Sequence, residues 1–311
     1  MNKKTIVEIH YHWDIGWSWE FVSEPLFNIL KQYYNVYSIT QQERLPDKIK
    51  INNAIIVPDL YFLQSHGFFK YLQPSQFTKT FFKKIILRLG GIRGLDKNPK
   101  LPSYIKHCKD IIATNHFLYN YAKQFNQNVS LIPNGLDLSQ WDYIGYNKEK
   151  FVVGFSGNIL DKQHQDDKGY NFIQNAINIT HFELKNALFR NNQIPHNLMK
   201  DQFYRHISCF VLPTRSEGNN NCIMECLALG IPVLTTKQAG FHGEMLTDYE
   251  NVIFIERDAK DIAEKLVMLK NYPKLQKKLS INGRKFAEQY HNIYNIAEEY
   301  KNVFDQALSI T

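Results

Sequence analysis

Short apolar runs rich in β-branched residues recur along the chain, and helix-like segments separate them. In the first half, the runs span residues 5–11, 35–40, 54–60, 110–115 and 129–134, with helical patterns near 23–34 and 116–125. Strands that alternate with helices pair in parallel, because a parallel connection needs a long crossover. The sequence therefore predicts an α/β chain built on parallel sheets.

A second set of such runs follows a polar, turn-rich stretch at residues 134–150. Its expected strands lie at 151–157, 209–214, 231–236 and 251–256, with helices near 219–229, 258–270 and from about 273 to the end. A length of 311 residues suits two domains. We expect two Rossmann-like, doubly wound domains, residues 1–142 and 143–311, and consider that the last helix packs back on the first domain. Ligands in such folds bind beyond the carboxyl ends of the strands, so we expect a site in the cleft between the sheets.

Targeting and redox signals point to one compartment. The chain contains no run of 18 continuous apolar residues, and its first residues turn polar too early for a secretory leader. Its four cysteines form no C-x-x-C pair, which favours reduced, buried thiols over a metal or redox site. We therefore expect a cytoplasmic protein.

The net charge of +7 lies in the first half of the chain. Residues 70–109 contain ten basic residues and one acid. A helix over residues 78–89 would gather Phe81, Phe82, Ile85, Ile86 and Leu89 on one face, beside Lys79, Lys83, Lys84 and Arg88. This pattern is typical of a helix on an anionic membrane surface, here the inner membrane face. A core helix of the first domain and a surface for a nucleic-acid acceptor remain open as alternatives.

Two glutamates flank the start of a predicted helix in the second half. The apolar run 209–214 ends in a Pro-Thr break, so Arg215 and Glu217 lie in the loop at the carboxyl end of a strand. Residues 219–221 are asparagines that suit a helix N-cap, and the helix start offers N–H groups to a phosphate or a sugar hydroxyl. Glu225 follows one turn later, where it can accept hydrogen bonds from a vicinal diol. The alternative makes Glu217 a solvated loop acid and Glu225 a partner of the helix dipole.

Five short sequence motifs, found in this order along the chain, strengthen the interpretation of Glu217 and Glu225 as ligand-binding residues. They are "LIPNGLD" (131–137), "VVGFSGN" (152–158), "DKGYNFI" (167–173), "FVLPTRSEG" (210–218) and "ECLALGIPVLTT" (225–236). Together they resemble the retaining glycosyltransferases of family 4, which have the GT-B fold of two domains facing across a cleft. The resemblance spans about residues 105–260. It implies a nucleotide-sugar donor held by the second domain, an acceptor held by the first, and retention of configuration at the anomeric carbon.

The resemblance also implies roles for single residues. Lys168 and Glu217 form the catalytic pair, with Lys168 on the donor diphosphate and Glu217 on hydroxyls of the transferred sugar. Glu225 holds the ribose diol. Asn158 stands where the family usually has an arginine, so the site loses a phosphate cation unless Lys162 or Arg215 replaces it. The full donor-binding set is Gly16, Asn158, Lys162, Lys168, Arg215, Glu217, Gly218, Asn219, Asn220, Asn221 and Glu225.

The first domain departs further from the family pattern, because its opening loop, "HYHWDIGWSWE" (10–20), contains a single glycine. The acceptor candidates are His12, Asp14, Trp17, His66, Lys83, Lys84 and Arg88. We expect no metal ligands, because the spacing of His10, His12 and Asp14 is short and lacks a distant partner. The resemblance likewise implies chemistry without a cofactor or a metal ion, with a UDP-sugar as the favoured co-substrate.

The leading hypothesis is a retaining transferase that moves a hexosyl or related sugar to a hydroxyl of a glycan or lipid-linked glycan of cell-surface polysaccharide synthesis. Two alternatives remain. One is a glycosyltransferase acting on hydroxymethylated DNA bases, and the other is a non-catalytic module that binds a sugar nucleotide or a glycan.

Overall fold

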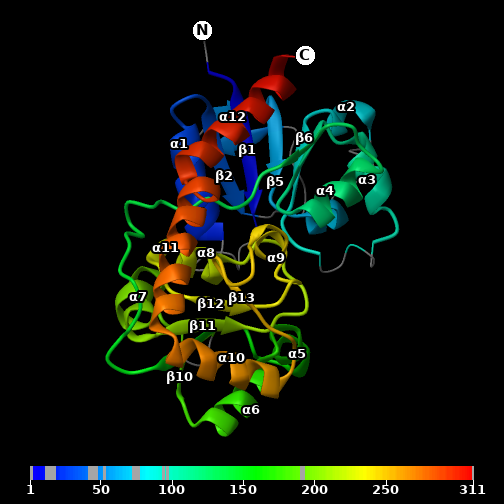
Figure 1. Cartoon of the computed structure of the whole chain (residues 1–311). Helices are drawn as coiled ribbons and strands as arrows, with labels where there is room; N and C mark the ends of the chain where they lie inside the picture. Colours follow the sequence, from blue (N-terminus) through cyan, green and yellow to red (C-terminus); the bar gives the residue numbers. More distant parts are fainter. Residues whose placement is uncertain are drawn as a thin grey trace. The chain divides into compact units, whose positions relative to one another are not determined.

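The computed structural model describes residues 3–10, 19–40, 48–51, 54–71, 78–92, 95, 98–189 and 193–309. The chain forms two compact units: unit 1 comprises residues 1–135 and 293–311, and unit 2 comprises residues 136–292. Each unit is built on a parallel sheet covered by helices (Figure 1). The predicted α/β class is therefore confirmed.

The sheet of unit 1 contains six parallel strands in the order β2-β1-β5-β6-β7-β8. They are β1 (Thr5–His10), β2 (Asn35–Thr40), β5 (Leu60–Leu63), β6 (Ile85–Leu89), β7 (Asp110–Ala113) and β8 (Val129–Leu131). The strands β3 (Ile49–Ile51) and β4 (Ala54–Ile56) pair with each other in antiparallel orientation. The central strands are apolar on both faces, as parallel strands covered by two helical layers must be.

Two groups of helices bury these faces. One face packs against α1 (Glu24–Leu30) and α12 (Ile293–Ser309), whose buried side chains include Phe27 and Phe304. The opposite face packs against α2 (Lys79–Phe82), α3 (Leu101–His107) and α4 (His116–Lys123). The two short helices η2 (Trp19–Ser23) and η3 (His66–Tyr71) complete unit 1.

The last helix, α12, completes the core of unit 1 (Figure 1). Its buried residues recur every three or four positions: Ile293, Ile296, Ala297, Tyr300, Val303, Phe304 and Ala307. The Phe304 ring lies 5.8 Å from the rings of Tyr34 and Phe62, centroid to centroid. The Tyr34 hydroxyl donates a 2.6 Å hydrogen bond to Asp305 Oδ1, which orients the helix.

The predicted helix over residues 78–89 is wrong. Only Lys79–Phe82 is helical, and Ile85–Leu89 forms β6 in the middle of the sheet, between β5 and β7. A strand buried on both faces carries no polar alternation, so its apolar run also fits a helical pattern. The membrane-surface interpretation loses the amphipathic helix on which it was built, while a membrane or nucleic-acid partner for the basic residues stays an untested prediction.

The basic residues of this segment hold neighbouring loops instead. Lys84 Nζ donates to the Pro58 carbonyl at 3.2 Å, and Arg88 Nη2 donates to Asn134 Oδ1. Lys83 is exposed. Within the described residues, no helix has the length and hydropathy needed to cross a membrane.

Unit 2 has a parallel sheet in the order β10-β9-β11-β12-β13. The strands are β9 (Val152–Gly157), β10 (Glu183–Leu188), β11 (Cys209–Leu212), β12 (Val233–Thr235) and β13 (Ile253–Phe254). The helices are α5 (Lys162–Lys168), α6 (Tyr170–Thr180), α7 (His196–Gln202), η5 (Tyr204–His206), α8 (Asn221–Leu229), α9 (Phe241–Met245), α10 (Ala259–Asn271) and α11 (Pro273–Tyr290). The helix expected from residue 273 onward is two helices, α11 and α12, which belong to different units.

Shortening one side chain of α12 tests its role in the core. We expect Phe304→Ala to lower the free energy of unfolding by about 3–5 kcal/mol, because a fully buried ring leaves a cavity among other rings. Urea denaturation measures the loss, and hydrogen exchange assigns it to unit 1. Asn302→Ala, an exposed change on the same helix, should shift stability by less than about 0.5 kcal/mol. Equal stability of the two variants would contradict a core role for α12.

Candidate functional site

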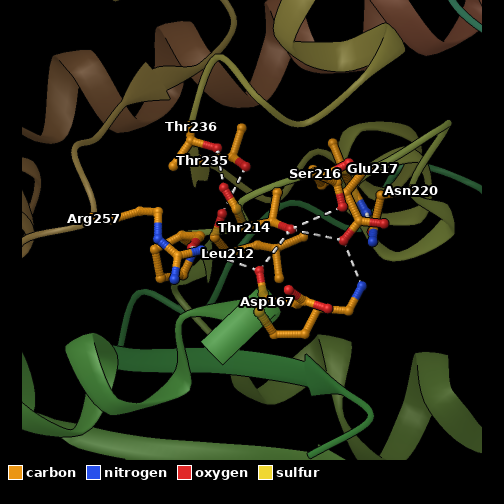
Figure 2. A network of polar contacts seen from close by, with 12 residues as sticks. Asp167, Leu212, Thr214, Ser216, Glu217, Asn220, Thr235, Thr236 and Arg257 are labelled. Atoms are coloured by element: carbon orange, nitrogen blue, oxygen red, sulfur yellow. Dashed lines mark hydrogen bonds and ion pairs between the residues drawn. The ribbon is translucent and has the colours of Figure 1, made fainter. Parts of the chain in front are cut away.

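The candidate site lies in unit 2, around the loop that follows β11. In a parallel sheet, the loops after the carboxyl ends of the strands form the usual ligand-binding edge. Residues 213–220 form this loop, and the preceding strand is fully buried. Figure 2 shows the polar contacts that Thr214, Glu217 and Asp167 make there. The polar side chains of this edge are therefore held by a rigid apolar scaffold.

Lys168 and Glu217, the two residues predicted as catalytic, are in direct contact with each other. Lys168 Nζ donates to Glu217 Oε1, and Thr214 Oγ1 donates to the same oxygen at 3.0 Å. The two charged side chains are 21% and 13% exposed. Because an ammonium carries three donors, Lys168 can bind Glu217 and an anion at the same time.

The position of Lys168 depends on the glycine that follows it. Gly169 ends α5 in the left-handed conformation, with φ of +68°, and a Cβ there would overlap the carbonyl oxygen of Pro213. Glycine is therefore required both by the backbone angle and by the close approach. This approach places the end of α5 directly against the loop after β11.

Further hydrogen bonds tie the two segments together. The Asp167 carbonyl accepts a hydrogen bond from Arg215 N at 2.8 Å, and Thr214 Oγ1, whose single hydrogen is directed to Glu217, lies 3.2 Å from the same carbonyl oxygen. Thr236 Oγ1, at the end of β12, donates to the Thr214 carbonyl at 2.7 Å (Figure 2). The loop that carries Glu217 is thus fixed by the end of α5 and by the residues after β12.

Arg257 is a structural cation that sequence reasoning missed. Its Nη1 donates to the carbonyls of Asp167 and Pro213 at 3.2 and 3.3 Å, and its Nη2 pairs with Asp166 Oδ1 at 3.0 Å. Burial and the nearby Arg215 charge lower the pKa of Arg257. No motif surrounds this residue, so only its position after β13 reveals its role.

Glu225 is buried within α8, with 3% of its surface exposed. The helix begins at Asn221, and Asn220 caps it by accepting a hydrogen bond from Ile223 N at 3.1 Å. Glu225 Oε1 lies 2.9 Å from His196 Nε2, and the Tyr204 hydroxyl donates to Oε2. Glu225 is therefore a fixed buried carboxylate with two specific partners, both of which sequence reasoning missed.

The backbone near Gly218 is held by a second close approach. Gly240 has φ of +61°, and a Cβ there would overlap the Gly218 carbonyl. Phe241 N donates to that carbonyl at 2.8 Å, and Glu217 N donates to the Gln238 carbonyl at 3.1 Å. Gly218 and Asn219 are buried, so their positions are set by packing as well as by these bonds.

The position of the expected arginine, Asn158, and its two possible replacements, Lys162 and Arg215, lie in different surroundings. Asn158 Oδ1 accepts a hydrogen bond from Leu160 N at 3.0 Å, which shapes the loop after β9. Lys162 is exposed at the first position of α5. Arg215 Nη2 pairs with Asp166 Oδ2 at 2.8 Å, so its charge is already engaged.

The acceptor candidates in unit 1 are not brought together on one helix. His66 is half-buried at the start of η3, and burial lowers its pKa. Lys83 follows α2, and Lys84 and Arg88 hold loops as given above. His12, Asp14, Gly16 and Trp17 lie outside the described residues. Within the part of the chain that the structure describes, no group of three His, Cys, Asp or Glu residues forms a metal site.

Solved structures share this architecture over nearly the whole chain. One is the sucrose-phosphate synthase of Thermosynechococcus elongatus, with a TM-score of 0.72, 13% identity, and coverage of 99% of this chain and 100% of that one. Another is Anabaena HepE in complex with UDP-glucose, with a TM-score of 0.66, 11% identity, and coverage of 97% and 99%. The protein has the GT-B fold of glycosyltransferases.

Part of the chain also resembles known glycosyltransferases in sequence. Residues 178–286 match the family model of glycosyl transferases group 1, and this region includes Glu217 and Glu225. Over 164 residues the chain is 29% identical to CapM of Staphylococcus aureus, a capsular polysaccharide biosynthesis glycosyltransferase. That alignment covers 53% of this chain and 39% of CapM, so the chain matches about two fifths of the relative. The predicted resemblance is confirmed at the level of group 1, while family 4 stays a prediction.

The contact between Gly169 and Pro213 can be tested by adding one methyl group. We expect Gly169→Ala to destabilise unit 2 by more than about 1 kcal/mol, because the new Cβ is incompatible with both the backbone angle and the space. Thermal unfolding measures the effect. Gly91→Ala is the control, since a Cβ added there meets no heavy atom of the described residues within 4 Å. A Gly169→Ala variant as stable as the control would show that the two segments separate freely.

Proposed function

We propose that the protein is a glycosyltransferase that binds a nucleotide-sugar at the carboxyl edge of the unit 2 sheet and transfers the sugar to a hydroxyl acceptor. The contact between Lys168 and Glu217 carries this proposal. An ammonium and a carboxylate lie side by side there, next to a loop fixed by Thr214 and Asp167, and this pairing supports a phosphate contact by the first and a sugar contact by the second. The match of residues 178–286 to glycosyl transferases group 1 supports the same reaction class.

Lys168 would stabilise the leaving group. Negative charge grows on the diphosphate as the glycosidic bond breaks, and a fixed ammonium at that point lowers the barrier. The contact with Glu217 holds the ammonium in place before the donor arrives. The chemistry would need no metal ion, because Lys168 and the N–H groups at the start of α8 supply the positive charge.

Glu217 would orient the transferred sugar. A carboxylate accepts strong hydrogen bonds from hydroxyls, and its orientation is set here by Lys168 and Thr214. The backbone from Gly218 to Asn221 would lie along the sugar and its phosphate, and Glu225 would bind the ribose diol. The acceptor hydroxyl would attack from the face that the nucleotide leaves, with retention of configuration, and the leaving phosphate would take its proton.

The similarities suggest a donor and an acceptor for this proposal. The structure of HepE contains UDP-glucose, which supports a UDP-sugar donor. CapM is a glycosyltransferase of capsular polysaccharide biosynthesis, which supports a glycan or lipid-linked glycan acceptor. A module that binds the donor without turnover is the second candidate, because Asn158 replaces the usual phosphate-binding arginine.

A thermal-shift screen with UDP-, GDP-, ADP- and CMP-sugars tests the donor assignment. We expect a UDP-sugar to raise the unfolding temperature, since a ligand at 100 times its Kd adds about 2.7 kcal/mol of stability. Donor hydrolysis or transfer to a glycan then separates an enzyme from a binding module. Stabilisation by none of these donors would contradict a nucleotide-sugar site in unit 2.

Removing the Lys168 ammonium tests its catalytic role. We expect Lys168→Ala to lower kcat about a hundredfold, as the loss of one preorganised charge does in other enzymes. Lys260→Ala provides the control, because Lys260 is an exposed lysine of the same unit, on α10, outside the proposed site. Steady-state kinetics at saturating donor measure both variants. A normal kcat for Lys168→Ala, or an equal loss in both variants, would remove Lys168 from the mechanism.

A further inference from the structure

Glu225 lies in a cluster of side chains that come from four separate segments of unit 2. His196 is the first residue of α7, Tyr204 begins η5, and Trp141 precedes β9. The Trp141 ring lies 5.2 Å from the His196 ring and 5.9 Å from the Tyr204 ring, centroid to centroid. The planes of these rings are inclined to the Trp141 plane by 50° and 72°, so a buried tryptophan packs against both partners of Glu225 and restricts their orientation.

The Glu225 carboxylate is a charged group among the buried apolar side chains of α8. The side chains on either side of it in α8, Ile223, Met224, Cys226 and Leu227, are apolar and buried. Burying a carboxylate among them costs free energy unless donors satisfy it, and an apolar side chain at this position would avoid that cost. Two donors from outside the helix are nevertheless placed on its two oxygens. This arrangement indicates a charge kept for a ligand.

We propose that Tyr204 and His196 are positioning residues of the donor site, which fix the two oxygens of Glu225 to receive the ribose diol of the donor. The inference rests on the proposed function. Each carboxylate oxygen accepts two hydrogen bonds, so one bond to the protein leaves a second position for a ribose hydroxyl. Two fixed oxygens match two adjacent hydroxyls.

The protonation of both donors suits this role. Burial raises the pKa of Tyr204 well above its usual value, so the hydroxyl keeps its proton and donates. A carboxylate only accepts, so the His196 nitrogen that faces it carries a hydrogen. The side chains of His196 and Glu225 are 19% and 4% exposed, and Tyr204 is fully buried. His196 is therefore the most exposed side chain of the three, and we expect the diol to approach from its side.

Tyr204→Phe removes one hydroxyl and keeps the ring. The affinities of UDP and 2′-deoxy-UDP, measured by calorimetry, report on the 2′-hydroxyl contact. We expect UDP to bind about tenfold more weakly to Tyr204→Phe, in keeping with one hydrogen bond to a charged group, and the preference for UDP over 2′-deoxy-UDP to shrink. The kcat at saturating donor should stay near normal, because the reacting atoms lie at Lys168 and Glu217.

Two further variants test whether an effect of Tyr204→Phe is specific to the Glu225 contact. Tyr34→Phe is the matched control, because Tyr34 also donates to a carboxylate, Asp305, but does so in unit 1. It should leave both nucleotide affinities unchanged. His196→Phe keeps a ring against Trp141 and removes the N–H at the exposed side, so it tests the same contact if Tyr204→Phe does not fold.

The outcomes separate this inference from the proposed function. An equal weakening of both nucleotides, or an unchanged preference in both site variants, overturns the positioning role while leaving sugar transfer intact. A wild-type protein that binds the two nucleotides equally overturns the ribose contact of Glu225 and this inference with it. A wild-type protein that binds neither nucleotide overturns the UDP-sugar proposal as well.

Discussion

The close contact between the backbone at Gly169 and the Pro213 carbonyl organises the candidate site of unit 2. It brings the end of α5 against the loop after β11, and the carbonyls of Asp167 and Pro213 then share the guanidinium of Arg257. Lys168 and Glu217 lie on opposite sides of this contact. The two side chains form their ion pair because the end of α5 and the loop after β11 are held together by backbone contacts of the protein itself.

The two glutamates of the site have different electrostatic surroundings. Glu217 is paired with the ammonium of Lys168, so its charge is balanced directly. Glu225 receives hydrogen bonds from a tyrosine and a histidine at a buried position. Under the proposed function, the partly exposed, charge-balanced carboxylate of Glu217 would bind the transferred sugar, and the buried carboxylate of Glu225 would bind the nucleoside.

The sequence predicted the parts of the molecule that local pattern determines. Strand β11 is a continuous apolar run, and the motif that follows it placed Glu217 in the loop at its carboxyl end, where the structure has it. The roles of Lys168, Glu217 and Glu225 stay predictions. The strand β6 was predicted as part of a helix, because a fully buried strand lacks alternation and its basic neighbours resembled a helical rim. His196, Tyr204 and Arg257 were missed because their partners lie up to 91 residues away, and no local pattern encodes such contacts.

The course of α12 has a consequence for protein synthesis. Unit 2 is a continuous segment, so all its strands are available to fold before residue 293 leaves the ribosome. The strands of unit 1 are synthesised before unit 2, but α12 is synthesised after it. Side chains such as Phe62 and Tyr34 therefore lack their packing partner Phe304 until the whole of unit 2 has been translated. Unit 1 therefore completes its core after unit 2 has been synthesised, and its apolar surface stays exposed to aggregation during that interval.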